Sequence, residues 1–178
     1  SLGGPILGDK VTFCTNLRQQ TIEGHLNGFR IFTVTDSSDF YSDNPDEWIS
    51  SKSGDSTYVP MNTTDNVSAL LKVGFNLFKG IRFSLLNSYS DDTWYWYDHS
   101  MKYNPDGRVG SHKKTLYTAF QMNHMITPKL FYELKLAIMK NNTGTYLFED
   151  SLDTRYVHDK YMENYGSGFF TGGQQKEH

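Results

Sequence analysis

The strongest constraint on the fold is an alternation of apolar and mixed side chains along several long segments of the chain. The clearest pair is Asn66 to Phe78 and Ile81 to Ser90, which are joined by Lys79-Gly80. Because successive side chains of a strand point to opposite faces of a sheet, this period of two predicts strands with one apolar face and one mixed face. The short connection predicts that the two strands form a hairpin.

Other segments repeat the pattern. Leu116 to Ile126 and Leu130 to Met139 alternate on either side of a turn at Thr127 to Lys129, and a weaker strand lies at Val11 to Arg18. Composition favours the same secondary structure, because the chain has 12 Phe and 12 Tyr but only three Ala. Aromatic residues favour strands, whereas alanine is the best helix former. The sequence therefore predicts an all-β fold.

The connections between these strands alternate in length. Short turns lie at Gly8 to Lys10, Lys79-Gly80 and Thr127 to Lys129, and long polar excursions cover residues 36–65 and 91–112. Tight turns on one side and long loops on the other are typical of bacterial outer-membrane barrels, whose strands need only about 9–11 residues to span the membrane. We therefore expect antiparallel up-and-down strands that form part of a transmembrane β-barrel wall, with short periplasmic turns and long extracellular loops.

Several phrases of the sequence resemble one family of membrane receptors. Ser1 to Ile6, followed by Gly8 to Phe13, looks like the junction between the plug and the first barrel hairpin of TonB-dependent outer-membrane receptors, particularly those of Bacteroidetes-like bacteria. Complete members have an N-terminal plug, a TonB box and about 22 strands. The resemblance implies that residues 1–178 form one partial β-barrel domain that holds the first barrel strands, without the plug and the remaining strands. Further similar phrases are Val59 to Asn62, Lys102 to Gly107, Thr127 to Glu133, Asp153 to Val157 and Gly168 to Gln174.

This resemblance implies a transport function in the bacterial outer membrane. The parent receptor would bind a scarce nutrient (a siderophore, vitamin, glycan or peptide) outside the cell and import it when TonB pulls on the plug. The implied partners are outer-membrane lipid, the protein's own plug domain, TonB and the small nutrient ligand. The residues expected to face lipid are Val67, Leu71, Val73, Phe75, Leu77, Phe83, Leu85, Leu134, Leu136 and Ile138, and those expected to face the lumen and plug are Asn76, Arg82, Gln121, Glu133 and Lys135.

The long loops are rich in aromatic residues, which suits stacking on sugars or other flat ligands. A run of four aromatic residues, Trp94 to Tyr97, equally suits an interfacial girdle or the twisted end of a sheet. The candidate ligand-binding residues are Trp48, Tyr58, Trp94, Trp96, Tyr103 and Arg155.

The sequence gives no sign of catalysis. It contains no nucleophile elbow, zinc-protease helix, P-loop or dinucleotide fingerprint, so we expect neither an enzyme nor a cofactor. Its six histidines lack ligand spacing and Cys14 is the only cysteine, so no metal site is predicted. The formal net charge of −3 gives no reason to expect nucleic acid as a partner.

A different class of function is compatible with the same strands. A soluble all-β module of the lectin type would use its aromatic loops to hold carbohydrate. Such a sandwich supplies a second sheet that covers the apolar face, whereas a barrel wall leaves that face bare. The surroundings of the apolar face therefore discriminate between the two hypotheses.

Overall fold

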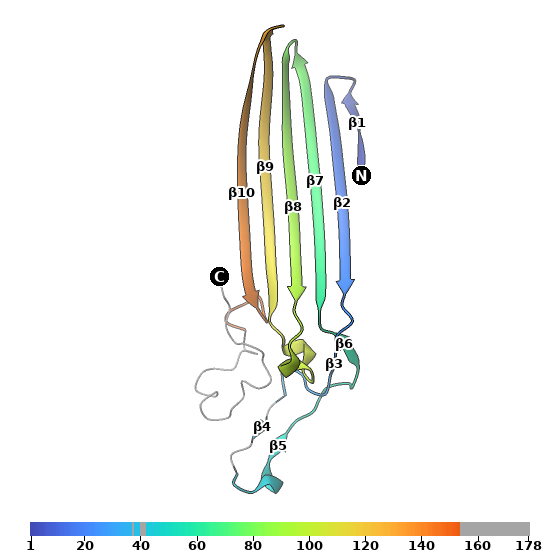
Figure 1. Cartoon of the computed structure of the whole chain (residues 1–178), viewed down its shortest axis with the longest axis vertical. Helices are drawn as coiled ribbons and strands as arrows, with labels where there is room; N and C mark the ends of the chain where they lie inside the picture. The colour runs from blue at the N-terminus through green and yellow to red at the C-terminus, as the bar shows by residue number, and fades with distance from the viewer. Residues whose placement is uncertain (37, 40–41, 154–178) are drawn as a thin grey trace. The chain divides into compact units, whose positions relative to one another are not determined.

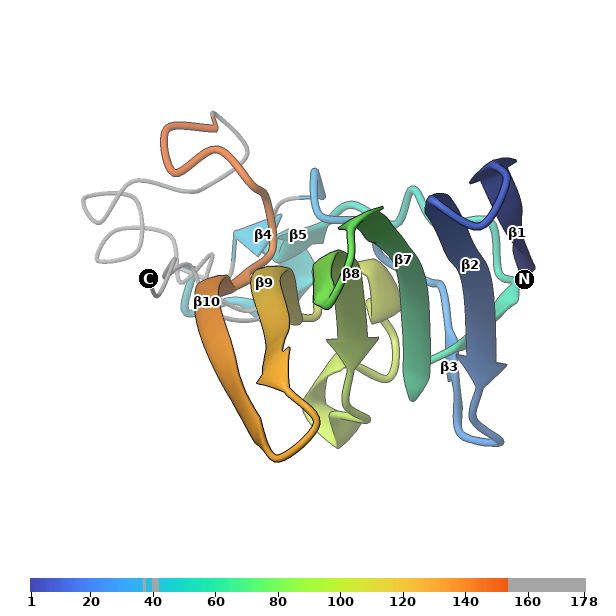
Figure 2. The ribbon, with the colours of Figure 1, turned by 90° about the horizontal axis from the view of Figure 1, so that it is seen from above.

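A computed structural model describes residues 1–36, 38–39 and 42–153. Its main element is a six-stranded antiparallel sheet in the order β1-β2-β7-β8-β9-β10 (Figures 1 and 2). The prediction of an all-β, antiparallel, up-and-down sheet is confirmed. The strands of this sheet are β1 Leu2–Leu7, β2 Val11–Glu23, β7 Thr63–Phe78, β8 Ile81–Tyr95, β9 Gly110–Thr127 and β10 Leu130–Tyr146.

Two of the three hairpins in this sheet, β1–β2 and β7–β8, have turns that need glycine. Gly8 and Gly80 have positive φ angles of 51° and 78°, in the left-handed region that side chains with a Cβ rarely occupy. A Cβ on Gly80 would also lie 2.8 Å from the carbonyl oxygen of Met125 on the neighbouring strand β9. The turns between β1 and β2 and between β7 and β8 therefore lie where the glycines predict them.

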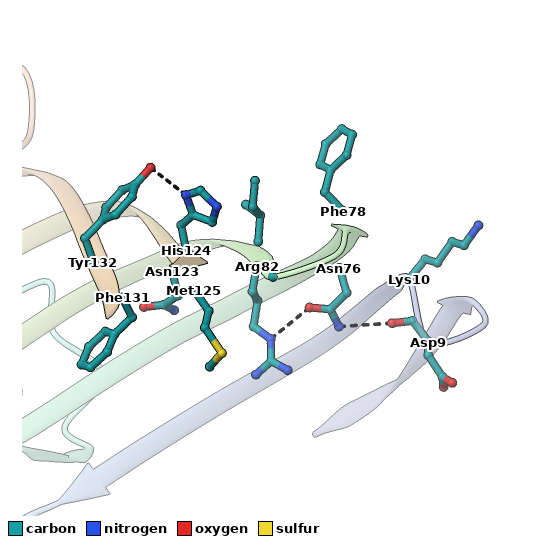
Figure 3. A pocket seen from close by; sticks show the side chains of 12 residues that line it. Asp9, Lys10, Asn76, Phe78, Arg82, Asn123, His124, Met125, Phe131 and Tyr132 are labelled. Carbon is teal, nitrogen blue, oxygen red and sulfur yellow. Dashed lines mark hydrogen bonds between the residues drawn. The ribbon is translucent and has the colours of Figure 1, made fainter. Parts of the chain in front are cut away.

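Side-chain contacts assign the residues to the two faces of the sheet. On one face, Phe83 stacks with Phe120 at a centroid distance of 6.0 Å, and Thr118 donates a hydrogen bond to Asn87. On the other face, Arg82 donates to Asn76 over 3.0 Å. Figure 3 shows this separation near the turns, with His124, Tyr132 and Phe78 on one side of the ribbon and Arg82, Asn76, Met125 and Phe131 on the other. The period of two read from the sequence therefore holds across β8, β9 and β10.

The chain divides into two compact units, and the division falls within the long strands. The first unit holds most of the six-stranded sheet, and the second holds the long connections with the adjoining strand ends. The first comprises Ser1–Gln20, Asn66–Asp92 and Lys113–Asn142, and the second comprises Thr21–Asp65, Thr93–His112 and Thr143–His178.

The second unit contains short elements that the sequence did not predict. Strand β3 (Asn27–Phe29) pairs antiparallel with β6 (Tyr58–Pro60), so the two ends of the first long connection are held together. Strand β4 (Ser38–Asp39) pairs with β5 (Ile49–Ser50). Three short 3-10 helices complete the described part of the unit: η1 Pro45–Glu47, η2 His99–Met101 and η3 Pro105–Gly107.

The buried apolar residues lie in this second unit. Met61 is fully buried and Met101 is 8% exposed, and both belong to the long connections rather than to an alternating strand segment. Gly28 of β3 packs directly against the same cluster, because a Cβ there would lie 2.7 Å from the Met61 sulfur and 2.8 Å from the Lys102 carbonyl oxygen. The small core of the described residues is thus built by residues from two different long connections.

This close approach gives a testable prediction. Gly28→Ala should destabilise the packed connections by roughly 1–3 kcal/mol, because the added methyl group overpacks a closed site. We expect faster hydrogen exchange in peptides covering residues 24–36, 42–62 and 98–108. Gly4→Ala is the matched control, since a Cβ at Gly4 meets nothing within 4 Å. Equal exchange in the two variants would contradict the packing described above.

Candidate functional site

One face of the sheet carries a broad apolar surface. It is formed by alternate residues of β7, β8, β9 and β10, and several of these side chains are strongly exposed: Ile138 is 75% exposed and Leu136 59% exposed. Soluble monomers rarely expose a contiguous apolar surface of this kind. The members predicted from the sequence all lie in these strands, although the side chain of Leu77 is outside the described part of the chain.

Polar groups limit this surface at both ends of the strands. Near the turn between β9 and β10, His124 Nδ1 and the Tyr132 hydroxyl form a 3.0 Å hydrogen bond. Toward the other end, Lys114 Nζ lies 3.9 Å from an Asp91 carboxylate oxygen. Lys140 follows the last apolar residue of β10 on this face. The apolar surface between these polar groups is called the apolar band. Ile126 and Leu130, which are 53% and 55% exposed, continue the apolar face beyond the His124–Tyr132 pair toward the turn.

The opposite face of the same strands is mixed: it carries charged and amide side chains, but also Phe131 and Met139, which are 75% and 62% exposed. Besides Arg82 and Asn76, it carries Gln121, whose amide donates to the Glu133 carboxylate, and Lys135, whose Nζ lies 3.1 Å from Glu133. Asn76 also donates to the backbone oxygen of Asp9 over 3.2 Å. These contacts link β10 with β9, β8 with β7, and β7 with the first turn.

A hollow of about 680 Å³ lies at the turn end of the sheet (Figure 3). It is bordered by groups of both faces, including Arg82, Asn76, Met125 and Phe131. The hollow is open, and its lining includes the hydrogen-bonded pair His124 and Tyr132.

A buried arginine organises the second unit. Arg108 is 8% exposed, and each of its nitrogens donates to a backbone carbonyl: Nε to Pro105 over 2.7 Å, Nη2 to Pro60 over 3.2 Å, and Nη1 to Met61. Its guanidinium lies 5.2 Å from the ring centre of Tyr95, which is a cation–π contact. Burial lowers the pKa of Arg108 from its ordinary value, and nearby Tyr95 and Asp106 oppose the shift. The arginine therefore joins the two long connections through their backbones.

A second arginine joins the same connections nearer the solvent. Arg30 Nε lies 2.6 Å from Asp106 and its Nη1 lies 3.0 Å from Asp55. The hydrogen bond to Asp106 is the main reason that the pKa of Arg30 is raised. The pKa of Asp55 is lowered, first by hydrogen bonds from Thr57 and also by Arg30. Because these groups are partly exposed, the ion pairs define geometry more than they add stability.

Asp36 holds the first long connection together from within. Its Oδ2 accepts hydrogen bonds from the backbone N–H of Thr33 over 2.9 Å and of Ser53 over 3.0 Å. Burial by itself would raise the pKa of Asp36, but the bonds from Ser53 and Thr33 outweigh it and the pKa is lowered. The carboxylate form is therefore the one that links residues 33 and 53.

The structure places five of the six candidate ligand residues in the second unit. Tyr58 and Tyr103 flank strand β3: the Tyr58 ring lies 5.2 Å from that of Phe29, and the backbone oxygen of Tyr103 accepts from the N–H groups of Ile31 and Phe32. Tyr58 is 77% exposed and Tyr103 is 49% exposed. Both rings are thus held by ordered backbone while most of their surface remains accessible.

The tryptophans differ from one another in their surroundings. Trp96 is 70% exposed and borders a hollow in the β8–β9 connection, whereas Trp94 lies within β8 and is half-buried. Trp48 follows η1 and donates from its indole nitrogen to the Ser42 carbonyl over 2.8 Å. Arg155 lies outside the described residues. The predicted residues therefore share one unit but do not form one site.

Sequence reasoning missed the residues that hold the unit together. Arg108 and Met61 lie in long polar segments where no periodicity marks a core. A signal was present in the phrases Val59 to Asn62 and Lys102 to Gly107. In the structure both phrases meet Gly28 and Arg108: a Cβ on Gly28 would lie close to the Met61 sulfur and the Lys102 carbonyl oxygen, and Arg108 donates to the carbonyls of Met61 and Pro105.

Comparisons with family models, curated proteins and solved structures gave no match. Within the described ranges, no helix is long and apolar enough to cross a membrane. The same residues contain no group of three or more His, Cys, Asp or Glu that could hold a metal ion. The function is therefore inferred from the two faces of the six-stranded sheet.

Replacing the buried arginine tests its organising role. Arg108→Met keeps an apolar stem but removes the donors to three backbone carbonyls, so the second unit should lose roughly 2–4 kcal/mol of stability. All three tryptophans, Trp48, Trp94 and Trp96, belong to this unit, so fluorescence during urea unfolding reports on it. Arg18→Met, at an exposed arginine bonded to Gln20, is the control. Equal unfolding midpoints would show that Arg108 contributes no more than a surface arginine.

The depressed pKa of Asp36 predicts an acid response. A carboxyl group whose folded-state pKa lies below its unfolded value of about 3.9 stabilises the fold above that pH, and the contribution is lost as pH falls through the folded-state pKa. The tryptophan unfolding midpoint should therefore fall between pH 5 and pH 2.5. Asp36→Asn keeps an acceptor oxygen but does not titrate, so its midpoint should fall less over the same range. If the unfolding midpoints of the two proteins declined equally, Asp36 would not contribute to the acid response.

Proposed function

We propose that this chain forms part of the wall and outer loops of a TonB-dependent receptor in the bacterial outer membrane, with the apolar band facing lipid. The observation that carries the proposal is the apolar face with polar margins at both ends. Such a band fits a hydrocarbon layer between two headgroup regions, because charged and hydrogen-bonding groups lie where water returns.

The height of the band agrees with this assignment. On β9 the face runs from Lys114 to His124, between the two polar margins. This interval has ten residue steps, or about 33 Å along a strand. Strands of outer-membrane barrels tilt by about 35–45°, which reduces this length to about 25 Å, the height of their apolar band.

Hydrogen bonding within the band is consistent with a lipid environment. Asn87 and Thr118 are the polar side chains among the apolar residues of β8 and β9, and Thr118 Oγ1 donates to Asn87 Oδ1 over 2.7 Å. Polar groups in hydrocarbon need such internal partners, because lipid offers none. Both residues are only partly exposed.

The mixed face is assigned to the lumen, where the receptor's own plug would lie. Arg82, Glu133 and Lys135 supply charges that lipid would not accommodate, but a hydrated lumen or a polar plug surface would. The long connections then lie outside the cell, where they bind the nutrient that TonB and the plug import. The sequence resemblance suggests the receptor family, and the apolar face of the sheet supports a place in the membrane wall.

A soluble carbohydrate-binding module is the alternative. Its apolar face would pack against a second sheet. In the part of the chain that the structure describes, exposures of 59% for Leu136 and 75% for Ile138 leave this portion of the face without such a layer. That observation favours the membrane wall over the sandwich.

Matched arginine substitutions on the two faces test the proposal. Leu134→Arg places a charge within the apolar band and should cost about 2–4 kcal/mol of stability in a bilayer. Ala137→Arg introduces the same side chain on the mixed face and should cost far less. Leu134 and Ala137 are both exposed in strand β10, so local packing is similar. Urea titration of the complete protein refolded into phosphatidylcholine vesicles measures both.

Two outcomes would contradict the membrane assignment. Equal costs for the two arginine variants would mean that the two faces meet the same environment. A folded, monomeric protein in plain buffer, detected by circular dichroism and size-exclusion chromatography without detergent, would favour the soluble module instead.

A further inference from the structure

The connection between β8 and β9 forms a hollow of its own in the second unit. Its volume is about 360 Å³, near the lower end of the range for small-molecule sites. Every side chain that borders it comes from one short stretch of chain, between Trp96 and Val109. The residues used in the argument are Trp96, Tyr97, Asp98, His99 and Arg108.

The walls of the hollow are ordered by local hydrogen bonds. The Tyr97 hydroxyl and His99 Nδ1 are 2.8 Å apart. Asp98 caps η2 by accepting from the backbone N–H and the hydroxyl of Ser100 over 2.9 Å and 2.6 Å. Met101, in the same turn, is buried, with only 8% of its surface exposed. A ligand would therefore meet a shaped surface, which lowers the entropic cost of binding.

The exposed tryptophan supplies the apolar part of the site. Trp96 is 70% exposed although it borders the hollow, so its ring is accessible to a ligand that enters. Flat apolar faces stack well on an indole ring. Around it, the Tyr97 hydroxyl, the His99 ring and the Asp98 carboxylate can exchange hydrogen bonds with hydroxyl groups.

The charges of the hollow disfavour an anionic ligand. All three nitrogens of Arg108 already donate to backbone carbonyls, so the arginine acts as a structural support. The other formal charge at the lining is the exposed carboxylate of Asp98, which would repel an anion. A neutral molecule with an apolar face and many hydroxyl groups fits both observations.

We infer that this hollow binds a neutral carbohydrate, with Trp96 as the stacking platform and Asp98, Tyr97 and His99 as hydrogen-bonding groups. The inference rests on the proposed function and deepens it, because it selects the glycan class from the nutrients such a receptor could take. The site recognises the feature that sugar rings have in common, an apolar face edged by hydroxyl groups.

Calorimetric titration of the complete protein in detergent tests this. The probes are neutral trisaccharides: maltotriose, laminaritriose, xylotriose and mannotriose. We expect at least one to bind, and Trp96→Ala to weaken its affinity about tenfold. Leu152→Ala is the control, because Leu152 is an 85% exposed apolar residue of the same unit that does not border the hollow. Binding of none of the trisaccharides, or equal losses in the two variants, would overturn the inference.

A second arm tests the ligand class. Galacturonic acid trisaccharide should bind more weakly than the best neutral probe. Asp98→Asn should reduce the difference in affinity between these two probes. Tighter binding of the acidic probe would overturn the assignment to neutral sugars. Trp96→Phe should give an intermediate affinity, with an unchanged circular dichroism spectrum as the check on folding. Vesicle insertion of the same preparation reports separately on the membrane wall, so a failure of either idea can be told from a failure of the other.

Discussion

The pairing of long alternating strands into one antiparallel sheet is the constraint on which the rest of this molecule depends. Each strand satisfies its backbone groups through its neighbours, so the side chains are free to present two different chemistries on the two faces. Phe83 with Phe120 and Arg82 with Asn76 illustrate the result on the same strand, at consecutive residues. A shift of one residue in register would exchange the two faces, so turns such as the one at Gly80 are as important as the strands.

This sheet leaves the long connections to find their own stability. Met61 and Arg108 provide that stability without strand alternation. The Met61 side chain is fully buried, and the Arg108 guanidinium donates to backbone carbonyls, including that of Met61 in the other connection. An arginine that donates only to carbonyls holds chain segments in place without a carboxylate, and its burial lowers its pKa. Exposed aromatic side chains such as Tyr58 and Tyr103 are then displayed on a fixed backbone.

The sheet could be predicted from the sequence because its signal is local. Leu130 to Met139 alternates residue by residue, and Gly80 marks a turn through its own backbone preference, so neither needs knowledge of distant parts of the chain. The pairing of β3 with β6 and the bridge from Arg108 to Met61 depend on contacts between segments about 30 and 47 residues apart. Of the candidate ligand residues, Trp96 was predicted from its type and loop position, but its hollow depends on the fold of η2.

Two kinds of apolar exposure in this chain thus have different physical meanings. The side chains of Leu136 and Ile138 belong to a continuous band with polar margins, so their exposure is explained by an extended apolar phase. Trp96 is isolated among hydrogen-bonding groups, and its exposure is explained by a small ligand with one apolar face. A single large apolar partner cannot satisfy both surfaces, because Asp98 and His99 beside Trp96 would lose water without gaining hydrogen bonds. The two surfaces therefore differ in chemistry, and the proposed partners, lipid for the band and sugar for the hollow, differ in the same way.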